Sequence, residues 1–264
     1  MKAQERSLVV EEIIYLLVSH GFLEAHITML PCFSSHKDQL QRIENMPRQE
    51  KELTSIHSNE AQEMVWEHVS FILGTETPSQ SLDDGITVQI SKFDTGSVYA
   101  SSAAYGYFVR RVDEKFQMEK TMEILSPRLS ETEKPKEDVS FAERVSILSG
   151  MIGGVHEYPN KDGMSFICDE KPNLLRNYVM SFELDTLYKC ATLRSIEMAN
   201  VIEKQTEALF GRAELQREAI PIGENEVMIL TLSGFKRLVL EAVAFGSFLW
   251  DAETYVDSYC NIIM

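Results

Sequence analysis

The chain has few cysteines, and none of them are spaced for chemistry. Its 264 residues include four cysteines, and no two form a Cys-x-x-Cys pair. This excludes the usual signatures of a zinc knuckle and of a thioredoxin-type redox pair. Scattered cysteines suit a reducing compartment, where they serve as ordinary core or surface residues. They are Cys32, Cys168, Cys190 and Cys260.

Long apolar runs are missing as well. No stretch approaches the roughly 18 consecutive apolar residues of a membrane-spanning helix, so we expect no span. The longest run near the start, IIYLL, follows two glutamates and lacks the features of a signal peptide. The sequence begins directly with an amphipathic pattern, so we expect no targeting peptide in this chain.

Positive charge is scarce. The chain has 25 lysines and arginines against 41 aspartates and glutamates, which gives a net charge of −16. A field of this sign repels phosphate backbones and anionic membranes, so we expect no nucleic-acid partner. The best basic clusters, Arg110-Arg111 and Lys236-Arg237, are too short for a nucleic-acid footprint.

The common motifs of catalysis and cofactor binding are absent. The sequence has no GxSxG, no GxxxxGK[ST], no GxGxxG and no Glu-x-x-His pair on a helix. His20 and Glu24 are four residues apart, but two ligands do not make a metal site. We therefore expect no cofactor and no metal.

Two charged positions could still carry chemistry. Glu241 is the only charge in LVLEAVAFGSFLW, so it is either a buried carboxyl with a raised pKa or the helical partner of Arg237, and we favour the pair. Arg110 either binds an anion or pairs with Asp251. Trp250 and Asp251 occupy the positions that match Arg110 and Arg111 in the second half of the chain.

Apolar spacing predicts helices joined by loops, with two short strands. A helix is expected over residues 3–24, residues 30–56 are loop-rich, and a second helix begins at Ser58 or Asn59 and ends at Gly74. His57 stands before this helix, where it would help to cap it. The remaining elements are a strand in ITVQISK, a long helix ending near Leu125, a linker in SPRLSETEKPKEDVS, a short helix at 139–152, a helix from about Asp185 to Gly211, a strand in EVMILTLS and a long helix in GFKRLVLEAVAFGSFLWDAETYVDSYC.

The two halves follow one plan of helix, glycine, loop, strand and long helix. Gly74 aligns with Gly211, and AYGYFVRRVDEKF aligns with AFGSFLWDAETYV. We interpret this as a duplicated unit with pseudo-two-fold packing. The expected fold is all-α with at most a small two-stranded β ribbon. It comprises a first unit at 1–125, linker and loops at 126–175, and a second unit at 176–264, packed as one compact domain.

Both long helices contain a glycine at matching positions, Gly106 and Gly246. A glycine inside a helix costs about 1 kcal/mol relative to alanine, so a close approach of another backbone is the expected reason for it. We predict that the two helices cross near these glycines. The flanks of the crossing would be filled by Tyr105, Phe108, Phe245 and Phe248.

Five ordered blocks of this sequence resemble one plant family, that of the UV-B-induced chloroplast protein, also called seed maturation-like protein. They are KAQERSLVVEEIIYLLV, VYASSAAYGYFVRRVDEKFQMEKTM, LRNYVMSFELDTL, IEKQTEALFGR and FKRLVLEAVAFGSFLWDAETYVDS. The resemblance is weakest from about Ser126 to Lys171. It implies a location in the chloroplast stroma and a domain of unknown function, with no catalytic or ligand residues to transfer. It also implies a transit peptide and a further helical segment upstream, whereas this sequence begins almost at KAQER, so we expect the chain to lack both.

From these observations we expect a non-enzymatic protein that acts through protein–protein contacts, linked to light or UV-B stress. One alternative is a protein that binds a small hydrophobic ligand, such as a pigment or lipid, between the two units. Another is an enzyme that uses Glu241, Asp251 or Glu253, which would require these carboxylates to converge in a cleft. Nothing in the sequence decides the oligomeric state.

Overall fold

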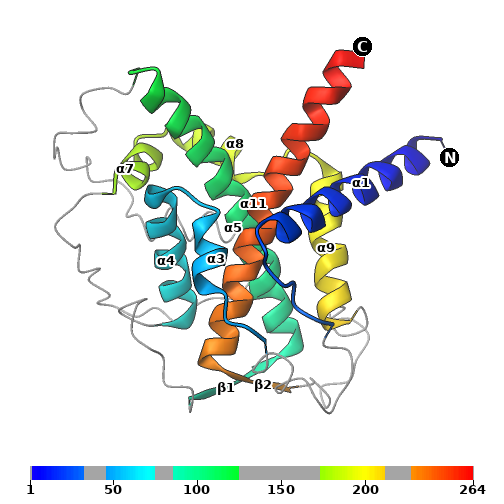
Figure 1. The fold of residues 1–264 in the computed structure, drawn as a ribbon, viewed down its shortest axis with the longest axis vertical. Coiled ribbons are helices and arrows are strands. Elements are labelled where there is room, and N and C mark those ends of the chain that lie inside the picture. Colours follow the sequence, from blue (N-terminus) through cyan, green and yellow to red (C-terminus); the bar gives the residue numbers. More distant parts are fainter. Residues whose placement is uncertain (1, 33–45, 75–85, 125–172, 212–226, 264) are drawn as a thin grey trace.

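The computed structural model describes residues 2–32, 46–74, 86–124, 173–211 and 227–263. They form a mainly helical protein with one short antiparallel sheet of two strands, which confirms the predicted fold class (Figure 1). The elements are α1 (Lys2–Glu24), α3 (Glu50–Ser55), α4 (Asn59–Leu73), β1 (Thr87–Ser91), α5 (Lys92–Thr121), α7 (Leu174–Met180), α8 (Leu184–Ala191), α9 (Ile196–Phe210), β2 (Val227–Thr231) and α11 (Leu232–Ile263).

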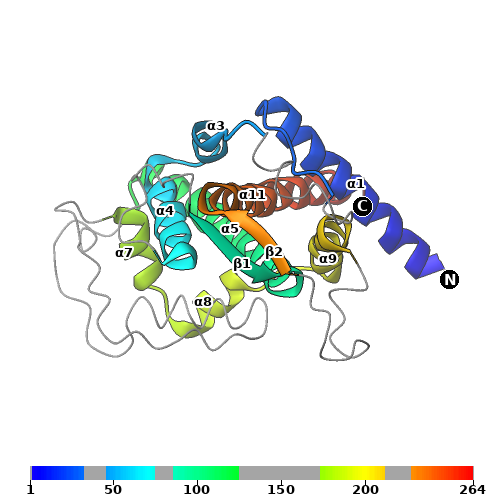
Figure 2. The same cartoon turned by 90° about the horizontal axis from the view of Figure 1, so that it is seen from below.

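The two longest described helices, α5 and α11, cross at the centre of the molecule. Helices α3, α4 and α7 lie on one side of this crossing, and α1 and α9 lie on the other, as Figure 2 shows from below. Helix α1 packs on α11 and α9, while α4 and α7 pack on α5. Buried apolar side chains from all these helices form a single hydrophobic core.

The β ribbon joins the beginnings of the two long helices. Strand β1 pairs with β2 in antiparallel register, with Val88 opposite Leu230 and Ile90 opposite Met228. Met228 and Leu230 are buried, because alternate residues of β2 point toward the core. Each strand continues directly into its long helix, so the ribbon holds the starts of α5 and α11 together. The prediction that the two strands pair is confirmed.

Helix α4 begins and ends where its capping residues predict. The Ser58 hydroxyl accepts a hydrogen bond from the Ala61 backbone N–H at 3.1 Å, which satisfies one of the free donors of the first turn. Gly74 ends the helix with a left-handed backbone (φ 65°), which glycine adopts without strain. The prediction that His57 caps this helix is wrong, since its ring nitrogens bind no backbone group among the described residues.

The single helix predicted from Asp185 to Gly211 is wrong. The structure has two helices there, α8 and α9, separated by residues 192–195. The Arg111 guanidinium of α5 binds the carbonyl oxygens of Lys189 (2.7 Å) and Cys190 (3.3 Å), so it caps the end of α8. The short helices α3 and α7 were also not predicted.

Four other predictions remain untested by this fold. The linker after residue 125 and the helix at 139–152 lie outside the described residues. The internal duplication and the unit boundaries at 125 and 176 stay predictions.

Candidate functional site

The central crossing is a contact between two backbones. A Cβ atom added to Gly106 would lie 1.9 Å from the carbonyl oxygen of Val243, and one added to Gly246 would lie 1.6 Å from that of Ala103. Only a hydrogen atom fits at either position, which is the physical reason for glycine inside both helices. The Ser247 hydroxyl donates to the Gly106 carbonyl at 3.2 Å across the crossing. No ligand fits between the helices at this point.

Two of the four aromatic residues predicted at the flanks of the crossing, Tyr105 and Phe248, contact other helices. Tyr105, Phe108 and Phe245 are buried, and Phe248 is partly buried. The Tyr105 ring stacks on His68 of α4 with centroids 4.1 Å apart, and its hydroxyl donates to the Met64 carbonyl at 3.1 Å. The Phe248 ring meets Phe22 of α1 edge-on at 5.0 Å. These rings therefore attach α4 and α1 to the crossing.

Polar pairs hold the two long helices together beyond the glycines. The Arg110 Nε donates to the Asp251 carboxylate at 2.8 Å, so the structure contains the intramolecular pair rather than a free anion-binding arginine. The Tyr107 hydroxyl donates to Glu253 at 2.5 Å. Burial, together with the Glu253 carboxylate, raises the pKa of Tyr107, so this phenol stays protonated and acts as a donor.

Trp250 lies beside these pairs and is surrounded by charged groups. The guanidinium groups of Arg111 and Arg194 lie 5.3 and 5.7 Å from its ring centroid, within the range of a cation–π contact. Its indole N–H donates to Glu114 at 2.6 Å. Arg194 comes from the segment between α8 and α9, so Trp250 links that segment to the long helices.

Glu241 is fully buried in α11 and binds the segment that follows α1. Its two carboxylate oxygens accept the Leu30 backbone N–H at 3.0 and 2.9 Å, and Arg237 lies 3.3 Å away. The Arg237 guanidinium also donates to the Thr28 carbonyl at 2.6 Å. Burial raises the pKa of Glu241 to about 7, although Arg237 and the Leu30 N–H both act to lower it. The sequence left two alternatives for Glu241, a buried carboxyl with a raised pKa or a pair with Arg237. The structure contains both features.

The three carboxylates that could have formed a catalytic group each have separate partners. Glu241 binds Leu30 and Arg237, Asp251 binds Arg110, and Glu253 binds Tyr107. The described contacts of each are with donors of the fold itself. These interactions position the helices. No two of the three carboxylates share a described partner, so they do not form the acid–base pair that the enzyme alternative requires.

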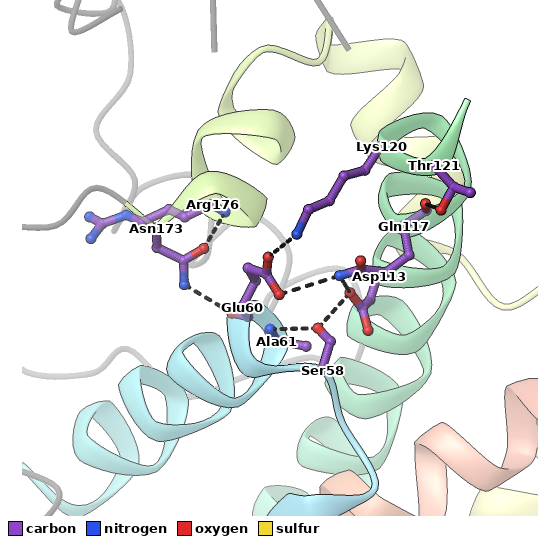
Figure 3. Close-up of polar contacts among 9 residues, drawn as sticks. All are labelled: Ser58, Glu60, Ala61, Asp113, Gln117, Lys120, Thr121, Asn173 and Arg176. Carbon is purple, nitrogen blue, oxygen red and sulfur yellow. Dashed lines mark hydrogen bonds and ion pairs between the residues drawn. The ribbon is translucent and has the colours of Figure 1, made fainter. Parts of the chain in front are cut away.

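A polar cluster at the start of α4 joins α4, α5 and α7 (Figure 3). The Ser58 hydroxyl donates to Asp113 of α5 at 2.7 Å. Lys120 donates to Glu60 at 2.6 Å, and this hydrogen bond is the main reason that the pKa of Glu60 is lowered. The Asn173 side chain donates to the Glu60 carbonyl at 2.9 Å and caps α7 through the Arg176 N–H.

Sequence reasoning found only Ser58 of this cluster, through its capping signal. Asp113, Lys120 and Asn173 had no local pattern, because their partners lie on other helices. Every polar group drawn in Figure 3 has a partner within the protein, so the cluster stabilises the helix packing.

The buried histidines are neutral core residues. Burial lowers the pKa of both His57 and His68 to about 3. His68 lies 3.0 Å from the Ser102 hydroxyl and stacks on Tyr105. Within the described ranges, no group of three or more His, Cys, Asp or Glu side chains is arranged to hold a metal ion. The exposed pair of His20 and Glu24 is 3.5 Å apart and has no third ligand in that part of the chain.

Helix α1 has an apolar face that no described element covers. On the opposite side, the structure buries Ile14, Val18 and Phe22. The helix is therefore apolar on two sides, a pattern that indicates a second buried surface. We call the exposed side the outer face of α1. Its members are Leu8 (51% exposed), Val9 (53%), Ile13 (45%), Leu16 (67%) and Leu23 (72%). Tyr15 (37%) lies beside α9 instead, where its hydroxyl donates to Gln205 at 3.0 Å.

These features define a mainly helical protein built on a glycine crossing of two long helices, with one uncovered apolar helix face. Of the helices that the structure describes, none is both long and apolar enough to cross a membrane. Residues 38–122 match the family described as "Protein of unknown function (DUF760)". No solved structure matches the chain.

The chain is also similar to a curated protein of Arabidopsis thaliana, a chloroplastic UV-B-induced protein. The two are 40% identical over 271 aligned positions, which cover 100% of this chain and 63% of the relative. The chain thus spans less than two thirds of that protein. This finding confirms the predicted resemblance to the plant UV-B-induced chloroplast family, and the relative's name supports the predicted chloroplast location.

Proposed function

We propose that this protein acts through protein–protein contacts in the chloroplast stroma, without catalysis of its own, and that the outer face of α1 is its contact surface. The observation that carries the proposal is the exposure of five large apolar side chains on this face of one helix. The relative's name links that protein to UV-B light, which supports a role in light or UV-B stress.

The size of the outer face supports this role. Five half-exposed side chains present on the order of 500 Å² of apolar surface, at the upper end of the largest patch on a typical monomer. At about 25 cal/mol per Å², burying this area would contribute roughly 12 kcal/mol before the costs of association. An apolar surface of this size favours a partner that removes it from water.

The state of the polar groups supports a role without catalysis. Glu241, Asp251 and Glu253 each bind a donor of the fold, and both buried histidines are held neutral. Catalysis by acid–base pairs needs groups poised to exchange protons with a substrate. The enzyme alternative stays a prediction, and none of the described contacts of these carboxylates supports it.

The small-ligand alternative also stays a prediction. Its expected place was the space between the two long helices, and at Gly106 and Gly246 that space is filled by backbone. A pigment or lipid would have to bind away from the crossing.

The native mass of the full-length protein isolated from leaf plastids tests the proposal. We expect additional mass of several kilodaltons or more on the wild type, retained in Met122→Glu and lost in Leu16→Glu. Leu16 (67% exposed) and Met122 (60%) are both exposed apolar residues, so neither change should affect folding by more than about 0.5 kcal/mol. Met122 lies just after α5 and serves as the matched control.

Three outcomes would contradict the proposal. A monomer without additional mass in the wild type and both variants would contradict a stable contact. A partner that Leu16→Glu retains would place the contact elsewhere on the molecule. Additional mass of only a few hundred daltons would favour the small-ligand alternative.

A further inference from the structure

We propose that the outer face of α1 docks an amphipathic helix of another protein, whose apolar seam packs on α1 and whose flanks carry lysine and arginine. This inference rests on the proposed function and names the chemistry of the partner. It is carried by the spacing of the exposed residues, by their position on the molecule and by the charges beside them.

The spacing is that of a coiled-coil seam. The exposed positions Val9, Ile13, Leu16, His20 and Leu23 follow one another at intervals of four, three, four and three residues. This is the alternation of the a and d positions of a heptad. Ile13 and His20 occupy the a positions, and valine or leucine occupies each d position. These residues therefore form one continuous stripe along the helix.

The opposite side of the same helix is already used. Ile14, Val18 and Phe22 are buried in the core, where α1 packs on α11 and α9. The seam from Val9 to Leu23 is about 21 Å long at 1.5 Å per residue, which matches a partner helix of about four turns. The N-terminal end of α1 extends beyond the other described helices in both views (Figures 1 and 2), so a partner could lie along it.

The charges beside the seam select the partner. Glu5, Glu12 and Glu24 are exposed and occupy three of the six e and g positions that flank the seam, the positions that set partner choice in coiled coils. The other three are Val10, Leu17 and Ser19, none of which is charged. Arg6 is the only lysine or arginine between residues 5 and 24, and the whole chain carries a net charge of −16. A helix with basic flanks complements this surface.

The same charges disfavour the other occupants. A second copy of the chain would bring a second set of glutamates and another charge of −16 to the interface. An anionic membrane surface would be repelled by the glutamates, since surface binding of amphipathic helices relies on lysine and arginine. Both remain measurable as outcomes of the test.

Two synthetic peptides of about two heptads, the length of the seam, test the inference. They share isoleucine at a and leucine at d, and they carry lysine at every e and g position in one peptide and glutamate in the other. Binding of each to the full chain is measured by titration calorimetry. We expect the lysine peptide to bind at least tenfold more tightly than the glutamate peptide, with a difference that shrinks as salt is added.

Variants separate seam packing from simple charge attraction. Leu16→Glu adds a negative charge, so it would strengthen a purely electrostatic contact with the lysine peptide. We expect it to weaken binding at least tenfold, and Met122→Glu to leave binding unchanged. Equal affinity for both peptides, no binding of either, or unchanged binding by Leu16→Glu would overturn the inference.

Two further measurements examine the other occupants. Sedimentation showing a dimer of the wild type that dissociates in Leu16→Glu would assign the outer face to a second copy. Flotation of the wild type, but not of Leu16→Glu, with phosphatidylglycerol vesicles would assign it to a lipid surface. Either result would overturn the basic-helix partner.

The inference and the proposed function can fail separately. A plastid partner lost in Leu16→Glu, combined with no binding of the lysine peptide, would keep the function and overturn the partner chemistry. Seam-dependent binding of the lysine peptide without any plastid partner would keep the docking site and overturn the proposed function.

Discussion

Replacing Gly246 by alanine should force the two central helices apart. The added Cβ would lie 1.6 Å from the Ala103 carbonyl oxygen and 2.7 Å from the Tyr107 nitrogen, while real Cβ contacts stay above 3.0 Å. Both obstacles are backbone atoms, so no side-chain rotation can relieve the overlap. Helices α5 and α11 would have to separate by about 1.4 Å.

The loss of stability follows from the space that opens. A gap of about 1.4 Å across a contact of roughly 100 Å² leaves about 140 Å³ unfilled, which costs about 3 kcal/mol. The higher helix propensity of alanine offsets about 1 kcal/mol of this loss. We therefore expect Gly246→Ala to lower the free energy of unfolding by about 2 kcal/mol, and Gly106→Ala to do the same.

Denaturant unfolding followed by circular dichroism measures this loss, and Gly21→Ala is the control. Gly21 lies inside α1, where the three atoms nearest an added Cβ all belong to the ring of Phe248, the first at 2.7 Å, and a side chain can move. We expect its cost to stay below about 1 kcal/mol. Since one substitution already opens the crossing, the double variant of Gly106 and Gly246 should lose much less than the sum of the two. Full additivity, or an unchanged Gly246→Ala protein, would refute the close contact.

Three other predictions concern single polar groups. Burial raises the pKa of Glu241 in the folded protein to about 7 from 4.5. The stability that its protonated carboxyl group contributes is therefore fully present below pH 4.5 and is lost as the pH rises through 7. Relative to Glu241→Gln, wild-type unfolding free energy should fall by about 3 kcal/mol over that window, and a constant difference would contradict the pKa assignment. Ser58→Ala removes the cap on the Ala61 N–H and should cost about 1 kcal/mol in denaturant unfolding; no loss would mean that water replaces the cap. Tyr107→Phe removes the hydroxyl that donates to Glu253 at 2.5 Å. It should lower the free energy of unfolding by about 1–3 kcal/mol and lower the thermal midpoint with it. An unchanged midpoint would argue against this hydrogen bond.

The sequence predicted those elements whose signals are local. Ser58 and Gly74 mark the ends of α4, because a cap acts within one turn of its own helix. The strand pair was predicted from alternation, since residues of period two share one face of a ribbon. Gly106 and Gly246 stood out because glycine is costly inside an apolar helix.

The missed features depend on distant residues. The break between α8 and α9 is stabilised by Arg111, whose partners Lys189 and Cys190 lie more than seventy positions away. The contacts of Asp113 with Ser58 and of Glu241 with Leu30 likewise join segments that are far apart in the sequence. A contact between two distant residues produces no periodic pattern in the sequence of either segment.

Sequence alone determined the mainly helical class, the ends of α4, the two strands and the acidic character of this protein, because propensity, capping and charge are properties of neighbouring residues. Tertiary structure decided which side of α1 enters the core. Helix α1 is apolar on two sides, and only packing against α11 and α9 buries Ile14, Val18 and Phe22 and leaves Leu16 and Leu23 in water. The proposed contact surface is therefore a product of packing, since burial of one apolar side is what leaves the other available.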